Sequence, residues 1–472
     1  MIIIVIILPK LTKVFALTFS DNLFGVVIPV KTNVDYTFSN YLSGEIQKKI
    51  KINLKNKIGA RNFLIRAYNQ INYSLFKMLS SGVIILSDGT FIKEDDIKSF
   101  CGVDYVGFNK LNDFVLKLSY IQKQLKKDNK TLLMVIGADK AGSISELIPK
   151  QYDNLKKDST NYTVLSHLLK MNKINTIDFN KYFNEIKDTL KYPVFYKYGI
   201  HWSGYSSTIA ADTIYNYISS QLKLPQHKFY SKALVSVSDS IAFTDNDLGE
   251  LSNLLFPIKE RVYYYPKLVF PKNEKKINAL IVGDSFAQSF YGFYPYYDSL
   301  LTDNSRYWYY NNYLSWPKKD EGLIFSSVNY INEYSNRDIY VIIETLTSFS
   351  QNFAYEFVNN LYNFIKFKEI KNNFSLNKLT NKIKKNCELL NGIKLKVISN
   401  KISDNLKLKL EAICFFEQNK VYKAIQEETI KEIKRNSLYN LVIKKAENNN
   451  ISIETQLLFE AHWIIEQEFK IN

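Results

Sequence analysis

Cysteine and histidine are scarce in this chain of 472 residues, and their scarcity excludes several classes of site. The three cysteines, Cys101, Cys387 and Cys414, are too few and too scattered for a disulfide framework or for a zinc site built on paired cysteines. Four histidines leave little material for an imidazole-based metal centre. We therefore expect no bound metal.

Glycine and proline are also rare, at 16 and 10 residues, which excludes collagen-like and proline-rich linker proteins. A hydrophobic fraction of 46% with 23% charged residues is enough to build a core, so the chain as a whole is not disordered. The length predicts about three domains of about 150 residues, or one large α/β domain with appendages.

Arginine is the third scarce residue, and it bears on the net charge of +16. Only six of the 62 basic residues are arginine, whereas the chain holds 47 asparagines. Arginine is the preferred residue for bidentate contacts to phosphates and bases, so its scarcity argues against a nucleic-acid partner. A solvated basic surface is the favoured interpretation, and affinity for an anionic polymer is the alternative.

The N-terminus is apolar over residues 2–8 and is then interrupted by Pro9 and Lys10. This run is too short to span a membrane, which takes about 20 apolar residues. It is similar to the apolar region of a secretory signal, although it lacks a positively charged start and a clear cleavage site. We expect residues 1–22 to be a signal peptide or membrane anchor, with a buried first strand over residues 2–8 as the alternative.

Buried parallel strands are indicated by continuous apolar runs at residues 131–137, 174–179, 279–283 and 340–344. Helical patterns lie between these runs, so the sequence predicts a doubly wound parallel α/β sheet. Ahead of it we expect one or two helices within residues 41–80 and a hairpin around Asp88-Gly89. The expected domains are a helical lead-in over 23–80, the α/β domain over 81–352 and a mostly helical C-terminal module over 353–472, with one further strand at 393–398.

Ser285 stands where one of the predicted strands ends, in the segment 278–288 (NALIVGDSFAQ). A residue there lies at the carboxyl edge of the sheet, where open α/β folds bind ligands. It also opens a predicted helix, whose free N–H groups can stabilise an oxyanion. Asp284 can brace the turn. The alternative is that Ser285 is an ordinary helix N-cap.

His201 lies in a loop beside Trp202, directly before an alanine-containing helical stretch. A neutral imidazole there can take the proton from a serine hydroxyl, which is the usual activation of that weak nucleophile. A purely structural histidine is the alternative.

These segments together resemble the alginate O-acetyltransferase family, whose members are SGNH-hydrolase-like (flavodoxin-like) proteins. The resemblance covers about residues 40–350. It is carried, in order, by the segments 58–61 (IGAR), 87–91 (SDGTF), 138–140 (ADK), 146–149 (ELIP), 174–179 (INTIDF), 201–202 (HW), 247–248 (DL) and 283–286 (GDSF).

The resemblance implies a serine-dependent O-acyltransferase or acetylesterase that acts on an extracellular or cell-envelope polysaccharide. It implies Ser285 as the nucleophile and His201 as the general base. It further implies a membrane O-acyltransferase partner that supplies the acyl group, and a location outside the cytoplasm, in the periplasm or cell envelope.

The chain departs from this family two residues before the histidine, where the family's orienting aspartate is replaced by Gly199. In the serine-protease template, replacing the orienting aspartate lowers turnover by about 10⁴. A backbone carbonyl could take its place, and the carboxylate candidates at the sheet edge are Asp178, Asp284 and Glu344. The alternative function is therefore a catalytically impaired protein that binds glycan or scaffolds a polysaccharide-modification complex.

Two further groups of residues are candidates for the site. The backbone N–H of Ser285 and the side chains of Asn311 and Asn312 could stabilise an oxyanion. The stretch 291–317 is rich in aromatic residues, and sugars stack on aromatic rings. We expect the substrate wall to include Trp202, Tyr309 and Tyr310, unless this density reflects only a tyrosine-rich core and surface.

Overall fold

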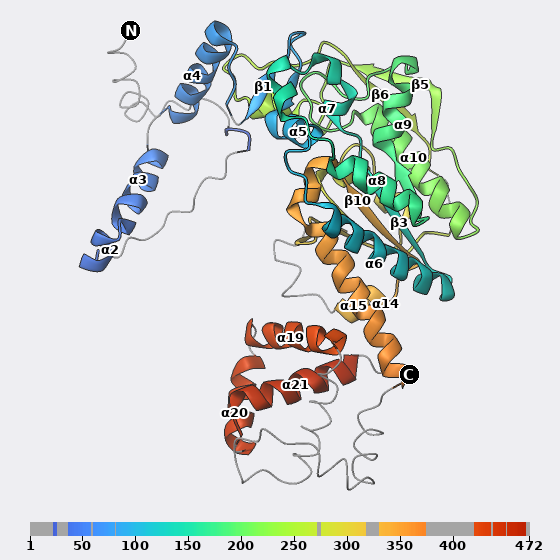
Figure 1. Ribbon diagram of the computed structural model, residues 1–472. Helices are drawn as coiled ribbons and strands as arrows, with labels where there is room; N and C mark the ends of the chain where they lie inside the picture. Colours follow the sequence, from blue (N-terminus) through green and yellow to red (C-terminus); the bar gives the residue numbers. More distant parts are fainter. Residues whose placement is uncertain are drawn as a thin grey trace.

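The computed structural model describes residues 22–25, 36–57, 60–80, 82–270, 275–317, 330–373, 420–435, 438–449 and 451–468 (Figure 1). The segment expected to be a signal or anchor lies outside these residues, apart from residue 22. Among the helices that the structure describes, none is both long and apolar enough to cross a lipid bilayer.

A six-stranded sheet forms the centre of the described chain, and the sequence-based fold class is confirmed. Its strands follow the spatial order β4 (Thr176–Asp178), β3 (Thr131–Ile136), β10 (Ile339–Glu344), β7 (Ala279–Gly283), β8 (Arg306–Tyr309) and β9 (Tyr313–Trp316). The first five are parallel, and β9 pairs antiparallel at the edge.

The strand order differs in one respect from that of flavodoxin, in which the parallel strands are ordered 2-1-3-4-5. Here the last parallel strand in the chain, β10, inserts between β3 and β7, which gives the order 2-1-5-3-4. Figure 1 shows β3 and β10 next to one another, with α8 above and α6 below them in this view. All five carboxyl ends lie at one edge, because the strands are parallel.

Both faces of the sheet are covered by helices, and successive residues of each strand point to opposite faces. Leu132 and Met134 of β3 pack on one face, whereas Leu133 and Val135 pack on the other. The first face is covered by α6 (Phe108–Lys127), α8 (Asn161–Met171) and α15 (Phe353–Asn373). The second is covered by α9 (Phe179–Ile186), α10 (Gly204–Gln221), α12 (Ser289–Gly292) and α13 (Tyr296–Leu300).

The expected boundary at residue 352 is wrong, because α15 is part of the α/β domain. Phe357 and Leu361 of this helix are fully buried in the core on the first face of the sheet. The C-terminal helices α19 (Lys420–Arg435), α20 (Leu438–Asn449) and α21 (Ile453–Glu468) share a separate small core around Val442 and Leu457. The strand expected at 393–398 lies outside the described residues.

The lead-in contains the expected helices, α2 (Phe38–Leu42), α3 (Glu45–Lys57) and α4 (Arg61–Phe76). The hairpin expected around Asp88-Gly89 is present as β1 (Val83–Ile85) and β2 (Phe91–Lys93). A second antiparallel pair, β5 (Tyr230–Ser238) and β6 (Tyr263–Leu268), was not expected. The remaining short elements are α5 (Glu94–Phe100), α7 (Lys140–Ser143), α11 (Asp247–Leu251), α14 (Tyr330–Ser335) and the 3₁₀ turns η1 (Ser145–Leu147), η2 (Lys150–Leu155), η3 (Lys187–Thr189), η4 (Ser285–Gln288) and η6 (Leu346–Gln351).

Candidate active site

Ser285 lies at the carboxyl edge of the sheet, two residues after β7 ends, and it opens the 3₁₀ turn η4 rather than a regular α-helix. The turn is tight because Gly283 has no side chain: a Cβ there would lie 2.9 Å from the Cβ of Ala287 and 3.0 Å from the Ile343 carbonyl oxygen. The Ser285 side chain is partly exposed at this edge. The sequence placed the residue correctly.

Asp284 braces the turn that presents Ser285. Its buried carboxylate accepts hydrogen bonds from the backbone N–H of Phe286 (3.0 Å), the backbone N–H and hydroxyl of Thr345 (2.7 Å each) and the hydroxyl of Ser348 (2.9 Å). Burial raises the pKa of this carboxyl, while the four donors oppose the shift. Asp284 therefore ties the end of β7 to the segment that follows β10.

The imidazole of His201 faces the Ser285 hydroxyl across this edge. The distance between His201 Nε2 and Ser285 Oγ is 2.8 Å, which is within hydrogen-bonding range. The ring is 9% exposed and packs against Phe286, with a ring-centroid distance of 4.7 Å. Two segments 84 positions apart in the sequence thus meet in one site.

Asp247 contacts the other nitrogen of the imidazole. Its Oδ2 lies 2.6 Å from His201 Nδ1, and its Oδ1 accepts a 2.8 Å hydrogen bond from the backbone N–H of Ile200. An ionised carboxylate can only accept, so this contact keeps the proton on Nδ1 and leaves the Nε2 lone pair facing Ser285. Asp247 lies in the segment 247–248 that carries the family resemblance, but nothing in the sequence links it to the histidine.

The three carboxylates expected to orient His201 make other contacts. Asp178 accepts hydrogen bonds from the Tyr162 hydroxyl and the Lys181 backbone N–H. It also ends β4, which lies three strands from β7, so at about 4.8 Å per strand the two strands are about 14 Å apart. Asp284 is occupied in the brace described above. Glu344 is buried against α6 on the opposite face of the sheet, where burial raises the pKa of its carboxyl well above the usual range.

Gly199 explains why the acid comes from another segment. A Cβ at Gly199 would lie 2.9 Å from the carbonyl oxygen of Asp245, so any side chain there would collide with the turn before α11. Helix α11, which follows this turn, docks on the histidine loop, because the N–H groups of Leu248 and Gly249 donate to the Tyr198 carbonyl at 2.9 and 3.0 Å. The missing side chain lets this turn approach closely enough to deliver Asp247.

The Lys140 side chain hydrogen-bonds to the same loop. Its buried ammonium lies within 3.1 Å of the carbonyl oxygens of Tyr196, Lys197 and Gly199, and of Phe91 in β2. An ammonium has only three N–H groups, so the four carbonyls share them. Lys140, which opens α7 directly after β3, therefore fixes the backbone that leads into His201.

The aromatic residues expected in the substrate wall lie in two places, the hydrophobic core and the edge of the sheet. Trp202 is fully buried and donates its indole N–H to Ser289, so the expectation that it forms part of a substrate wall is wrong. Tyr309 and Tyr310 are partly buried at the end of β8, beside β7. Burial raises the pKa of Tyr310, and hydrogen bonding to side chains that include Ser285 opposes this shift.

The two asparagine candidates also differ. Asn311 is 2% exposed in the turn after β8, and neither atom of its amide has a hydrogen-bond partner among the described residues. Asn312 is exposed. A buried amide without partners costs about 1–3 kcal/mol, so Asn311 is the more unusual of the two.

Comparison with known proteins finds a matching family model and several similar solved structures. A family model described as the SGNH hydrolase-like domain of the acetyltransferase AlgX matches residues 106–303. The match includes all three residues that meet at the sheet edge, Ser285, His201 and Asp247. No curated protein matches the sequence significantly.

Several solved structures are similar to the chain at low sequence identity. The O-acetyltransferase domain of Pseudomonas putida AlgJ is 15% identical and covers 60% of this chain and 99% of its own, with a TM-score of 0.37. Pseudomonas aeruginosa AlgX is 13% identical, with 60% and 67% coverage and a TM-score of 0.37. Bacillus cereus PatB1 is 13% identical, with 52% and 93% coverage and a TM-score of 0.36. The family match bears out the resemblance found in the sequence: residues 106–303 match the SGNH hydrolase-like acetyltransferase domain that AlgX represents.

Proposed function

We propose that this protein transfers an acetyl group to, or removes one from, a polysaccharide hydroxyl, with Ser285, His201 and Asp247 as its catalytic triad. The observation that carries the proposal is the unbroken chain of contacts from Ser285 Oγ to His201 Nε2 (2.8 Å) and from His201 Nδ1 to Asp247 Oδ2 (2.6 Å). Such a relay is the usual way to activate a serine hydroxyl near neutral pH.

In the first step, His201 Nε2 accepts the proton of the Ser285 hydroxyl while Oγ attacks the carbonyl carbon of the acetyl donor. The tetrahedral intermediate then collapses, and the donor's oxygen leaves with the proton held by His201. The product is acetyl-Ser285. Asp247 holds the imidazole in the required tautomer and stabilises the imidazolium that forms during the step.

In the second step, a sugar hydroxyl gives its proton to His201 and attacks the acetyl carbon. Ser285 leaves and recovers that proton from His201, so the enzyme returns to its starting state. If water takes the place of the sugar, the same step releases acetate and the protein acts as an esterase. No cofactor takes part in this mechanism.

The oxyanion of each intermediate needs donors beside Ser285. The backbone N–H of Ser285 is the first candidate, because it begins η4 and finds no hydrogen-bond acceptor in the described part of the chain. The Asn311 amide is the second candidate, because it is buried without partners in the turn beside β7. Removal of one such donor costs about 10²–10³ in kcat in comparable sites.

The competing proposal, a catalytically impaired scaffold, depended on the absence of an acid beside His201. The contact with Asp247 removes that ground. We place the protein outside the cytoplasm, with a membrane O-acyltransferase as the source of the acetyl group, by analogy with the family.

Trapping of the acetyl-enzyme tests the proposal. The purified protein is incubated with p-nitrophenyl acetate, quenched in acid and analysed by peptide mass spectrometry, beside Ser285→Ala and His201→Ala variants. We expect acetylation at Ser285 in the wild type and none in either variant. A wild-type protein that hydrolyses the ester no faster than Ser285→Ala, with no acetylated Ser285 peptide, would overturn the proposal.

A further inference from the structure

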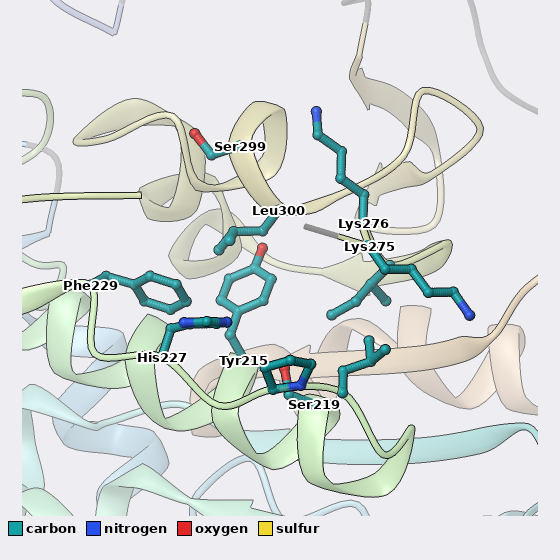
Figure 2. A pocket seen from close by; sticks show the side chains of 11 residues that line it. Tyr215, Ser219, His227, Phe229, Lys275, Lys276, Ser299 and Leu300 are labelled. Carbon is teal, nitrogen blue, oxygen red and sulfur yellow. The ribbon is translucent and has the colours of Figure 1, made fainter. Parts of the chain in front are cut away.

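A cavity of about 230 Å³ lies near the amino end of β7, whereas Ser285 follows its carboxyl end. Figure 2 shows the side chains that line it. It is bounded by the C-terminal half of α10, the segment that leads to β5, the residues just before β7, and the end of α13. The cavity and Ser285 lie beyond opposite ends of β7. This strand has five residues at about 3.3 Å each, so its ends are about 17 Å apart. The cavity is therefore separate from the site described above.

Three hydroxyl groups line this cavity without protein partners. Tyr215 is 4% exposed, and its hydroxyl makes no hydrogen bond within the described residues. Figure 2 shows this hydroxyl directed into the cavity, near Leu300. The hydroxyls of Ser219 and Ser299 likewise make no side-chain hydrogen bond in the part of the chain that the structure describes. The hydroxyls of Tyr215, Ser219 and Ser299 are therefore free to bind a polar ligand or water in the cavity.

The charge at the cavity is of one sign. Lys275 and Lys276 stand at its rim, and no carboxylate is among the described lining residues. Lys276 donates to the Asp298 carbonyl at 2.7 Å, whereas Lys275 forms no ion pair with a described residue. Lys275 is exposed, so its ammonium is available to a bound anion.

The walls of the cavity are aromatic and apolar. Tyr215 and Phe229 meet edge to face, with ring centroids 6.0 Å apart. A volume of about 230 Å³ is at the small end for a ligand site, so the cavity suits one small ring rather than a long chain. A ligand with several hydroxyls, apolar C–H groups and one negative charge matches the hydroxyls, the rings and the ammonium together.

We propose that this cavity binds one anionic saccharide unit, with its hydroxyls on Tyr215, Ser219 and Ser299 and its negative charge on Lys275. The binding site does not depend on acetyl transfer at Ser285. If the proposed function holds, it gives the protein a second contact with a charged polysaccharide, beyond the reacting sugar.

Calorimetric titration of the full-length protein tests the site, with glucuronate and glucose 6-phosphate as two anionic probes and glucose as the neutral control. We expect at least one anion to bind more tightly than glucose, and the comparison between the two identifies whether a carboxylate or a phosphate is preferred. Equal affinity for all three sugars, or no binding of either anion, would overturn the proposal.

Two variants locate the binding. Tyr215→Phe removes one oxygen and preserves the ring, so we expect affinity for the preferred anion to fall about threefold to tenfold. Lys275→Gln changes an exposed side chain, and it should abolish the preference for the anion over glucose. Circular dichroism confirms that both variants are folded.

Ser285→Ala separates this site from the catalytic one. It should bind the anion as tightly as the wild type does, even if acetyl transfer is lost. Anion binding that disappears in Ser285→Ala and persists in both Tyr215→Phe and Lys275→Gln would place the ligand at the sheet edge of Ser285 and refute the second site.

Discussion

Asp247→Asn is the sharpest test of the relay, because the carboxylate makes two contacts that an amide cannot both reproduce. Oδ1 accepts from the Ile200 N–H at 2.8 Å, and Oδ2 faces His201 Nδ1 at 2.6 Å. If the amide oxygen keeps the Ile200 N–H, the NH₂ group faces Nδ1 and forces the imidazole proton onto Nε2. The nitrogen that faces Ser285 then has no lone pair to accept a proton.

The alternative orientation of the amide is no better. With its oxygen on Nδ1, the NH₂ group of the new asparagine points at the Ile200 N–H, and two donors meet at a distance of about 2.8 Å, the separation that the carboxylate has now. In neither orientation can the amide accept hydrogen bonds from both the Ile200 N–H and the His201 Nδ1–H, as the carboxylate does. We expect kcat to fall by about 10³–10⁴, as in the serine-protease template, which is about 4–5.5 kcal/mol in the activation free energy.

The assay is steady-state hydrolysis of p-nitrophenyl acetate, with the Ser285→Ala rate subtracted. Asp178→Asn is the matched control, because Asp178 is a sheet-edge carboxylate of the same size that caps α9 and does not contact the ring. We expect the control to retain wild-type kcat. An Asp247→Asn enzyme within about tenfold of wild type, or a control that loses as much, would refute the reasoning.

Three further predictions concern the surroundings of the site. Gly199→Asp should lower activity, although it restores the family's residue, because its Cβ would lie 2.9 Å from the Asp245 carbonyl oxygen; higher kcat in the same ester assay would contradict the observed loop packing. Lys140→Met leaves four carbonyls without their donor, so we expect the free energy of unfolding in urea to fall by about 3–5 kcal/mol; a loss below about 1 kcal/mol would show that the loop does not need this cation. Burial raises the pKa of Asp96 to about 8 and that of Asp139 to about 6, so between pH 4 and these values the folded state binds protons that the unfolded state has released. The free energy of unfolding should therefore fall as pH rises from 5 to 7, by up to about 1.4 kcal/mol per pH unit for Asp96, with Asp139 adding a similar slope only up to about pH 6. Asp96→Asn should flatten this dependence; an unchanged slope in that variant would contradict the assignment.

Local pattern was sufficient to predict the strands that carry the site. Each of β3, β7 and β10 is an unbroken apolar run because both of its faces are covered by helices, and such runs are visible in the sequence. Ser285 follows from its place after the end of β7, and His201 from its place in the loop before α10. The strands β8 and β9 and the β5–β6 pair were not predicted, because strands rich in tyrosine, tryptophan and serine lack that apolar signature.

The partner of His201 could not be predicted in the same way. Asp247 reaches the ring only because the turn before α11 folds against Gly199, a contact that depends on close backbone approach and has no periodic signal. The sequence did hold an indirect clue. A glycine where the family has an acid both removes one carboxylate and opens the space through which another can arrive, but only coordinates reveal which residue fills it.

The position of β10 has a consequence for when the turn that carries Ser285 becomes fixed during synthesis. The strands that flank it, β3 and β7, leave the ribosome well before β10 does, and they cannot hydrogen-bond to one another across the gap that it later fills. Thr345 and Ser348, which fasten the turn beneath the reactive hydroxyl, arrive with the same late segment. A nascent chain that ends before residue 339 lacks the contacts of Asp284 with Thr345 and Ser348, so we expect the turn that carries Ser285 to be fixed only once β10 has joined the sheet.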